Sequence, residues 1–213
     1  MKKFVFLAVL AALVFCFIPQ SSIWAEEGTK LTGWIIFKTD VPTNSSGNWS
    51  HELTSYTQYG NWGVNVDAYY SYKTGYLEAA PALVWNHGPI YLMAGYLTNN
   101  DSQSFVPVGI WLAGKMKKID YFIDVRNYFG LNGSEGFLDS FLNITYPLGK
   151  KWQIGADLEQ IHYWEKSSND TFLAGPVVGY KLAKGLKLCV RAAREWSGGD
   201  YTDKVRMFLQ YEF

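Results

Sequence analysis

Apolar and polar residues alternate along most of this 213-residue chain, in segments of about ten residues that turn-forming residues separate. Successive side chains of a β-strand point to opposite faces, so each segment is expected to have one apolar and one polar face. No stretch after residue 25 has the period of a helix, so we expect an all-β, antiparallel fold. The last segment is the most regular, with only Phe208 interrupting its polar set; its apolar residues are Val205, Met207, Leu209, Tyr211 and Phe213.

The pattern predicts about twelve strands. They run near residues 30–39, 49–59, 62–73, 76–86, 89–99, 104–115, 119–130, 136–147, 151–164, 171–182, 186–197 and 203–213. Tight links such as 147–151 mostly take turns with longer links rich in Ser, Asn, Asp and Gly, such as 40–48. Short turns at one end and longer polar loops at the other are typical of a transmembrane β-barrel. We expect both termini at the short-turn end, with the first and last strands paired to close the barrel.

The apolar face is expected to point outward. Aromatic residues make up 17% of the chain and charged residues 18%, an aromatic-rich and charge-poor balance for a soluble domain. Aromatic rings such as Trp62 and Trp85 end the apolar face near the short turns, and rings such as Tyr72 and Trp196 end it near the loops, as at bilayer interfaces. The other face carries charges in mid-strand, which lipid tolerates only if they point inward. A secreted, water-soluble barrel or sandwich, with its apolar face inside, is the alternative.

The first 25 residues have the layout of a secretory signal peptide, with Lys2 and Lys3 before an apolar run and Ala25 as a small residue for cleavage. We therefore expect a leader over 1–25 and one barrel domain over 26–213. Without Lys2 and Lys3, 17 of the 19 basic residues remain against 19 acidic ones, so nucleic acid is not an expected partner. Cys189 is then the remaining cysteine, which excludes an intrachain disulfide.

These features together resemble a bacterial outer-membrane β-barrel protein, at the level of architecture and over the whole chain after the leader. The resemblance implies an outer-membrane location and contact with outer-membrane lipid. It also implies that the barrel assembly machinery reads the last strand, with Leu209, Tyr211 and Phe213 as the signal. We expect a monomer.

The inward face carries the functional signal. Acids are expected mainly on the middle strands and bases mainly on the first and last strands, so that an acidic wall would face a basic wall across the lumen. Opposed charges of this kind favour polar solutes over apolar ones, and we interpret the chain as a narrow pore for small polar solutes. The predicted lining residues are Asp67, Glu78, Asp124, Arg126, Asp139, Asp157, Glu159, Lys181, Lys187, Arg191 and Arg206.

A plugged structural barrel is the alternative for the interior. Eight strands leave a filled interior and sixteen or more an open channel, so about twelve lies between. Large inward side chains could fill much of this space and leave the charges as internal ion pairs. They are Trp34, Tyr69, Tyr91, Met93, Phe105, Trp111, Phe122, Phe137 and Phe141, with Phe208 on the last strand.

A second alternative is a lipid hydrolase acting at the outer leaflet. If Leu148 pairs with Trp152, then Ser140 faces Gln160 and His162 lies diagonally from Ser140, on the lipid-facing side. Ser140 would be the nucleophile and His162 the base, but no third residue to orient His162 is evident. No cofactor or metal motif is present in the sequence, so neither is expected.

Overall fold

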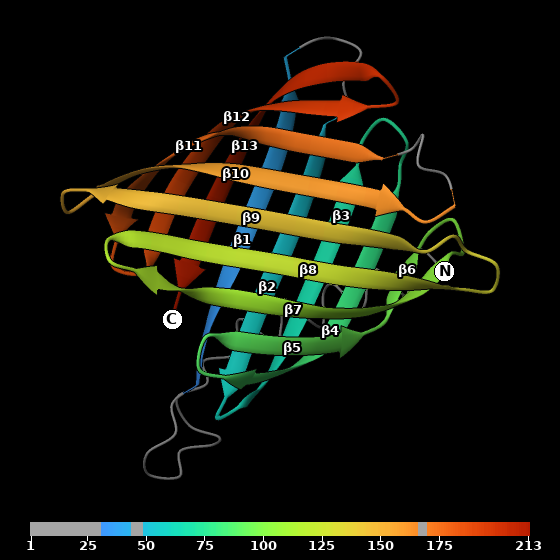
Figure 1. Ribbon diagram of the computed structural model, residues 1–213, viewed down its shortest axis with the longest axis horizontal. Helices are drawn as coiled ribbons and strands as arrows, with labels where there is room; N and C mark the ends of the chain where they lie inside the picture. The colour runs from blue at the N-terminus through green and yellow to red at the C-terminus, as the bar shows by residue number, and fades with distance from the viewer. Residues whose placement is uncertain (1–30, 44–48, 166–169) are drawn as a thin grey trace.

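The computed structural model describes residues 31–43, 49–165 and 170–213, which form one closed antiparallel sheet of thirteen strands (Figure 1). In the described residues no helix is long and apolar enough to cross a membrane. The strands are β1 (Thr32–Pro42), β2 (Ser50–Tyr59), β3 (Trp62–Ser71), β4 (Leu77–His87), β5 (Ile90–Gly95), β6 (Leu97–Asn99), β7 (Ser104–Met116), β8 (Ile119–Leu131), β9 (Phe137–Leu148), β10 (Trp152–Tyr163), β11 (Thr171–Ala183), β12 (Leu186–Ser197) and β13 (Asp200–Glu212).

Twelve strand positions surround the barrel, because β5 and β6 are two halves of one strand. Both halves lie between β4 and β7, and the ladder is interrupted at Tyr96, whose N–H donates to the carbonyl of Pro81. The predicted count of about twelve and the predicted antiparallel barrel are therefore confirmed. The predicted pairing of Ser140 with Gln160 is confirmed as well.

The sheet closes where β1 pairs with β13, as predicted. The pairing begins at Trp34 opposite Glu212 and ends at Pro42 opposite Lys204. Both strands are longer at the loop end than the sequence suggested, since β1 extends to residue 42 and β13 starts at residue 200. The added length has a physical cause, because each strand continues as long as the other supplies hydrogen-bonding partners. It also places Asp40 inside the barrel, opposite Arg206.

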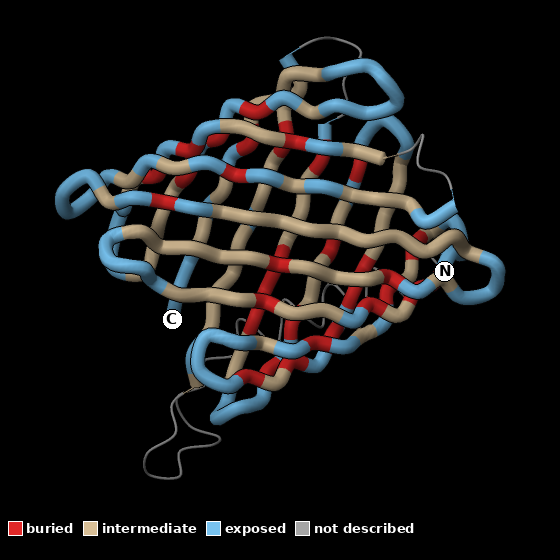
Figure 2. The backbone as a smooth tube through the Cα atoms, viewed as in Figure 1, coloured by how far each residue is buried: buried red, intermediate tan, exposed pale blue. Residues whose placement is uncertain are grey.

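The apolar face points outward. Along β13, Met207, Leu209 and Tyr211 are each more than 40% exposed, whereas Arg206, directly before Met207, is buried. Exposed and buried positions also alternate along β3, β4 and β12, whereas most positions of β8 and β9 are of intermediate exposure (Figure 2). At the two ends of the outward face lie exposed rings such as Trp62 and Trp152 near the short turns, and Tyr72 and Phe129 near the loops. A soluble core would have the opposite arrangement, so the water-soluble alternative is wrong.

Two walls of the barrel make contact across the lumen. Seen down the shortest axis of the molecule, strands β7 to β10 cross in front of strands β1 to β3 (Figure 1). Ring contacts bridge these two walls, since Trp34 on β1 lies 6.1 Å from Trp111 on β7, centroid to centroid. Inward side chains of the two walls therefore meet inside the barrel.

Phe213 is part of the closing seam. Its N–H donates to the carbonyl of Gly33 over 3.0 Å, and its carbonyl accepts from the Gly33 N–H. A side chain at Gly33 would collide with the Phe213 ring and with the carbonyl of Tyr56, at 2.8 and 2.2 Å from an added Cβ. The absence of a side chain at Gly33 lets the terminal ring pack against the first strand.

This seam predicts a loss of stability on replacing Phe213 with Ala. The ring contacts with Gly33 and Tyr211 would disappear, at a cost of about 1 kcal/mol in the free energy of unfolding. Urea titration in detergent micelles, followed by the heat-modifiable band of the folded barrel on a gel, measures this loss. Phe213→Tyr keeps the ring and should behave as wild type. An unchanged midpoint for Phe213→Ala would contradict a structural role for the ring.

Candidate functional site in the barrel lumen

One group of inward charges lies on the strands around the closing seam. We call it the arginine cluster; its members are Asp40, Asp157, Glu159, Arg191 and Arg206. Arg191 is fully buried and donates to Asp157 over 3.1 Å and to Glu159 over 3.3 Å. Arg206 donates to Glu159 over 2.6 Å and also to Asp40. The two guanidinium groups therefore share Glu159 and bind one further carboxylate each.

Asp40 is a member of the arginine cluster that sequence reasoning missed. The stretch 40–48 is rich in Ser, Asn and Gly and suggested a loop, but the structure continues β1 through Asp40. The available signal was the alternation itself, because Asp40 continues the inward set of Trp34 and Lys38. Its carboxylate accepts from the Arg206 Nη2 over 2.7 Å.

A second group lies on β3, β4, β8 and β9. We call it the acid-rich cluster; its members are Asp67, Glu78, Asp124, Arg126 and Asp139. Arg126 binds Asp124 through two hydrogen bonds of 2.9 and 3.0 Å and reaches Asp67 on β3. Glu78 instead accepts from the Tyr76 hydroxyl over 2.7 Å. The Oδ1 atom of Asp139 is buried and has no hydrogen-bond partner within the described part of the chain.

The expected division into an acidic and a basic wall is only partly present. Lys38 on the supposedly basic side forms an ion pair of 2.5 Å with Glu52 on β2. Asp40 also lies on that side, and Arg126 lies among the acids. Because oppositely charged neighbours on the same wall pair with each other, the separation of charge across the lumen is weaker than the sequence suggested.

Between the short turns and the loop tips, the described inward positions still hold more acids than bases. Nine carboxylates and five bases share this region, which is an excess of four acids. The acids are Asp40, Glu52, Asp67, Glu78, Asp124, Asp139, Asp157, Glu159 and Glu195, and the bases are Lys38, Arg126, Arg191, Lys204 and Arg206. The predicted lining residues Lys181 and Lys187 lie opposite each other on β11 and β12, at the short-turn end and away from both clusters.

Five rings form an aromatic cluster across the lumen nearer the short turns. They come from β1, β2, β5, β7 and β8 and are Trp34, Tyr56, Tyr91, Trp111 and Phe122. Trp111 is 2% exposed and lies within 6.2 Å of the other four, centroid to centroid. The guanidinium of Arg126 lies 5.4 Å from the centre of its ring. The aromatic cluster narrows the lumen and contacts the acid-rich cluster through Arg126.

Phe208, the apparent flaw in the last strand, lies inside the barrel. The guanidinium groups of Arg191 and Arg206 lie 5.7 and 6.0 Å from its ring centre. An aromatic face attracts a cation through its quadrupole. The ring of Phe208 therefore stabilises the two guanidinium groups of the arginine cluster.

The residues of the hydrolase alternative lie on the outward face, outside the lumen. The Nδ1 atom of His162 lies 2.7 Å from an oxygen of Asp170, which supplies the orienting group that the sequence did not reveal. This hydrogen bond, with one from the Tyr163 N–H, lowers the pKa of the Asp170 carboxyl. Among the described residues, however, no hydrogen bond joins Ser140 to His162, so the pair is incomplete as a nucleophile and base.

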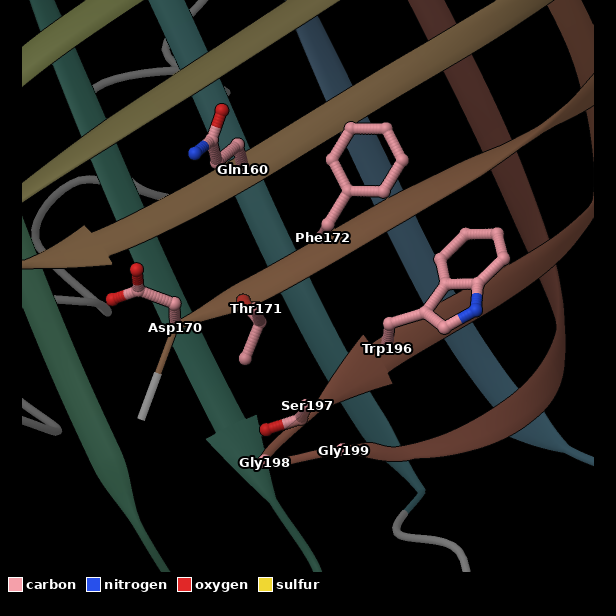
Figure 3. A pocket seen from close by; sticks show the side chains of 8 residues that line it. All are labelled: Gln160, Asp170, Thr171, Phe172, Trp196, Ser197, Gly198 and Gly199. Atoms are coloured by element: carbon pink, nitrogen blue, oxygen red, sulfur yellow. The ribbon is translucent and has the colours of Figure 1, made fainter. Parts of the chain in front are cut away.

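A shallow pocket of about 400 Å³ opens next to Asp170 on the same outer face. Phe172 and Trp196 line it from neighbouring strands, with ring centres 5.6 Å apart (Figure 3). Both rings are exposed and belong to the aromatic band near the loops. The pocket is thus a feature of the outer surface and does not connect to the inward charges. In the described part of the chain no group of three or more His, Cys, Asp or Glu side chains could hold a metal ion.

The arginine cluster predicts a large loss of stability for Arg191→Met. The change leaves Asp157, whose side chain is 1% exposed, without its main partner, and breaking a buried pair in this way costs about 3–5 kcal/mol. Chemical unfolding in micelles measures the loss. Arg194→Met is the matched control on the same strand, because its pair with Asp203 is solvent-exposed and should contribute little. Equal losses for both variants would show that the buried ion pairs of Arg191 contribute no more to stability than the exposed pair of Arg194.

Comparison with known proteins identifies solved structures with a similar fold. No protein-family model matches the sequence, and no curated protein matches it. Among solved structures, a KdgM porin in complex with disordered oligogalacturonate is 14% identical, with 84% of this chain and 99% of that chain covered and a TM-score of 0.61. The NanC porin is 10% identical, with 86% and 100% covered and a TM-score of 0.59. The chain therefore has the closed β-barrel fold found in the KdgM and NanC porins.

Proposed function

We propose that this protein is a narrow pore for small polar solutes in the outer membrane of a bacterium. In this proposal residues 1–25 are a signal peptide that directs export, and residues 26–213 form the barrel domain. The observation that carries the proposal is the distribution of polarity, with apolar side chains on the outside of a closed barrel and two charged clusters on the inside.

The outward face supports a membrane location. Leu83 and Val64 in mid-strand are 55% and 51% exposed, a poor arrangement in water and a good one in lipid. A closed sheet pairs its backbone groups internally, as lipid requires. Rings at both ends of this face suit the two interfaces of a bilayer. We infer contact with outer-membrane lipid around the whole barrel and a monomeric protein.

The inward face supports passage of small polar solutes. Charged and amide side chains line the lumen, and a lumen lined by charge is how β-barrel pores select their solutes. The aromatic cluster around Trp111 limits the size of what can pass. Two similar solved structures are named as porins, which agrees with this function for the shared fold.

The last strand supports assembly in the same membrane. Leu209, Tyr211 and Phe213 face outward, more than a third exposed, and form the end of the chain. We propose that these three residues are the segment that the barrel assembly machinery reads.

Planar-bilayer recording of the purified, folded protein tests the pore. Discrete conductance steps are expected, and Trp111→Ala should raise the step size because it removes the ring at the centre of the aromatic cluster. The radius gained is of the order of one side chain, so we expect an increase of about twofold or more.

Trp62→Ala is the matched control, since it removes the same ring from the outward face near the same end of the barrel. Its step size should equal that of wild type. A folded protein that never conducts, with or without Trp111, would overturn the pore and indicate a plugged structural barrel.

A further inference from the structure

The charges of the lumen point to the class of solute, and we infer that the pore selects cations over anions. This inference rests on the proposed pore function and deepens it. The described inward positions between the short turns and the loop tips hold four more acids than bases. A lumen with low-dielectric walls and an excess of one charge concentrates the opposite ion.

Most of the excess comes from the acid-rich cluster. Arg126 is its one base, and it binds Asp67 and Asp124. Glu78 and Asp139 have no ion pair with a base in the described part of the chain. The cluster therefore has three more acids than bases, and its strands face each other across the lumen, where Arg126 on β8 reaches Asp67 on β3.

Two buried oxygens independently lack a hydrogen-bond donor or a cation among the described residues. The Oδ1 atoms of Asn65 and Asp139 are buried and accept no hydrogen bond within the described part of the chain. Asn65 is fully buried, and its amide nitrogen is already committed to the carbonyl of Ser55 and to Asp67. Buried acceptors of this kind normally find a donor or a cation. An acceptor oxygen persists on a carboxyl group in either protonation state, so this preference does not require every acid to be ionised.

The aromatic rings inside the barrel favour the same sign of charge. The aromatic cluster offers indole and phenol faces beside the acid-rich cluster, and the guanidinium of Arg126 already lies over Trp111. Such faces attract cations and not anions. The expected solutes are therefore small monovalent cations and small polar molecules that carry an ammonium or guanidinium group.

Other charged positions do not reverse this preference. The arginine cluster contains three acids and two bases and is close to neutral. Lys204 pairs with Glu195 over 2.6 Å. Lys181 and Lys187 lie at the short-turn end, where salt screens exposed charges over about 10 Å.

Reversal potentials in planar bilayers test the inference, with an approximately tenfold gradient of potassium chloride across the membrane. The wild-type protein is expected to reverse close to the potassium equilibrium potential. Asp139→Asn removes one carboxyl group of the acid-rich cluster without removing an ion pair, and it keeps the shape of the side chain. It should lower the ratio of potassium to chloride permeability by about twofold or more, as expected for a charge close to the ion path.

Asp203→Asn is the matched control, because it makes the same change on the outward face, where Asp203 pairs with Arg194. Its permeability ratio should equal that of wild type. Conductance steps with an anion-directed or zero reversal potential would overturn cation selection and leave the pore intact. Equal effects of the two substitutions would also overturn it, and the absence of any steps would overturn the pore and this inference together.

Discussion

The pairing of β1 with β13 is the constraint on which the rest of the structure depends. A sheet that did not close would leave two rows of backbone donors and acceptors unpaired, which lipid does not satisfy. Closure also defines an inside and an outside for a chain that alternates apolar and polar residues. The same pairing brings Asp40 next to Arg206 and Gly33 next to Phe213, so the seam combines backbone, ionic and ring contacts.

Contacts across the lumen then determine which inward side chains meet. Side chains of β1 to β3 reach partners far away in the sequence on β7 and β8, as Arg126 reaches Asp67 and Trp34 reaches Trp111. The arginine cluster is nearly neutral and contains two buried arginines. The acid-rich cluster has one base, Arg126, which two carboxylates share. In the proposed pore, the arginine cluster would stabilise the barrel and the acid-rich cluster would select the solute.

The strands and their faces could be predicted from the sequence, because alternation depends only on the pleat of a strand. The pairing of Ser140 with Gln160 followed from a single turn between Leu148 and Trp152. Contacts across the lumen could not be predicted in this way, since they depend on how close opposite walls of the barrel lie. The position of Asp40 was not predicted for a related reason. The composition of residues 40–48 suggested a loop, but pairing with β13 extends β1 through Asp40. The hydrogen bond from His162 to Asp170 joins a strand to a loop, and alternation carries no information about loops.

Labelling at the last strand tests the assignment of faces most directly. Met207 and Phe208 are replaced singly by Cys in a Cys189→Ser background, labelled with an environment-sensitive fluorophore and reconstituted into vesicles. We expect brominated lipid to quench the label at position 207 and to leave the label at position 208 unchanged. Met207 is 42% exposed on the outside, whereas Phe208 packs against Arg191 and Arg206 inside the barrel. Quenching at position 208 and not at position 207 would contradict an apolar exterior around a charged lumen.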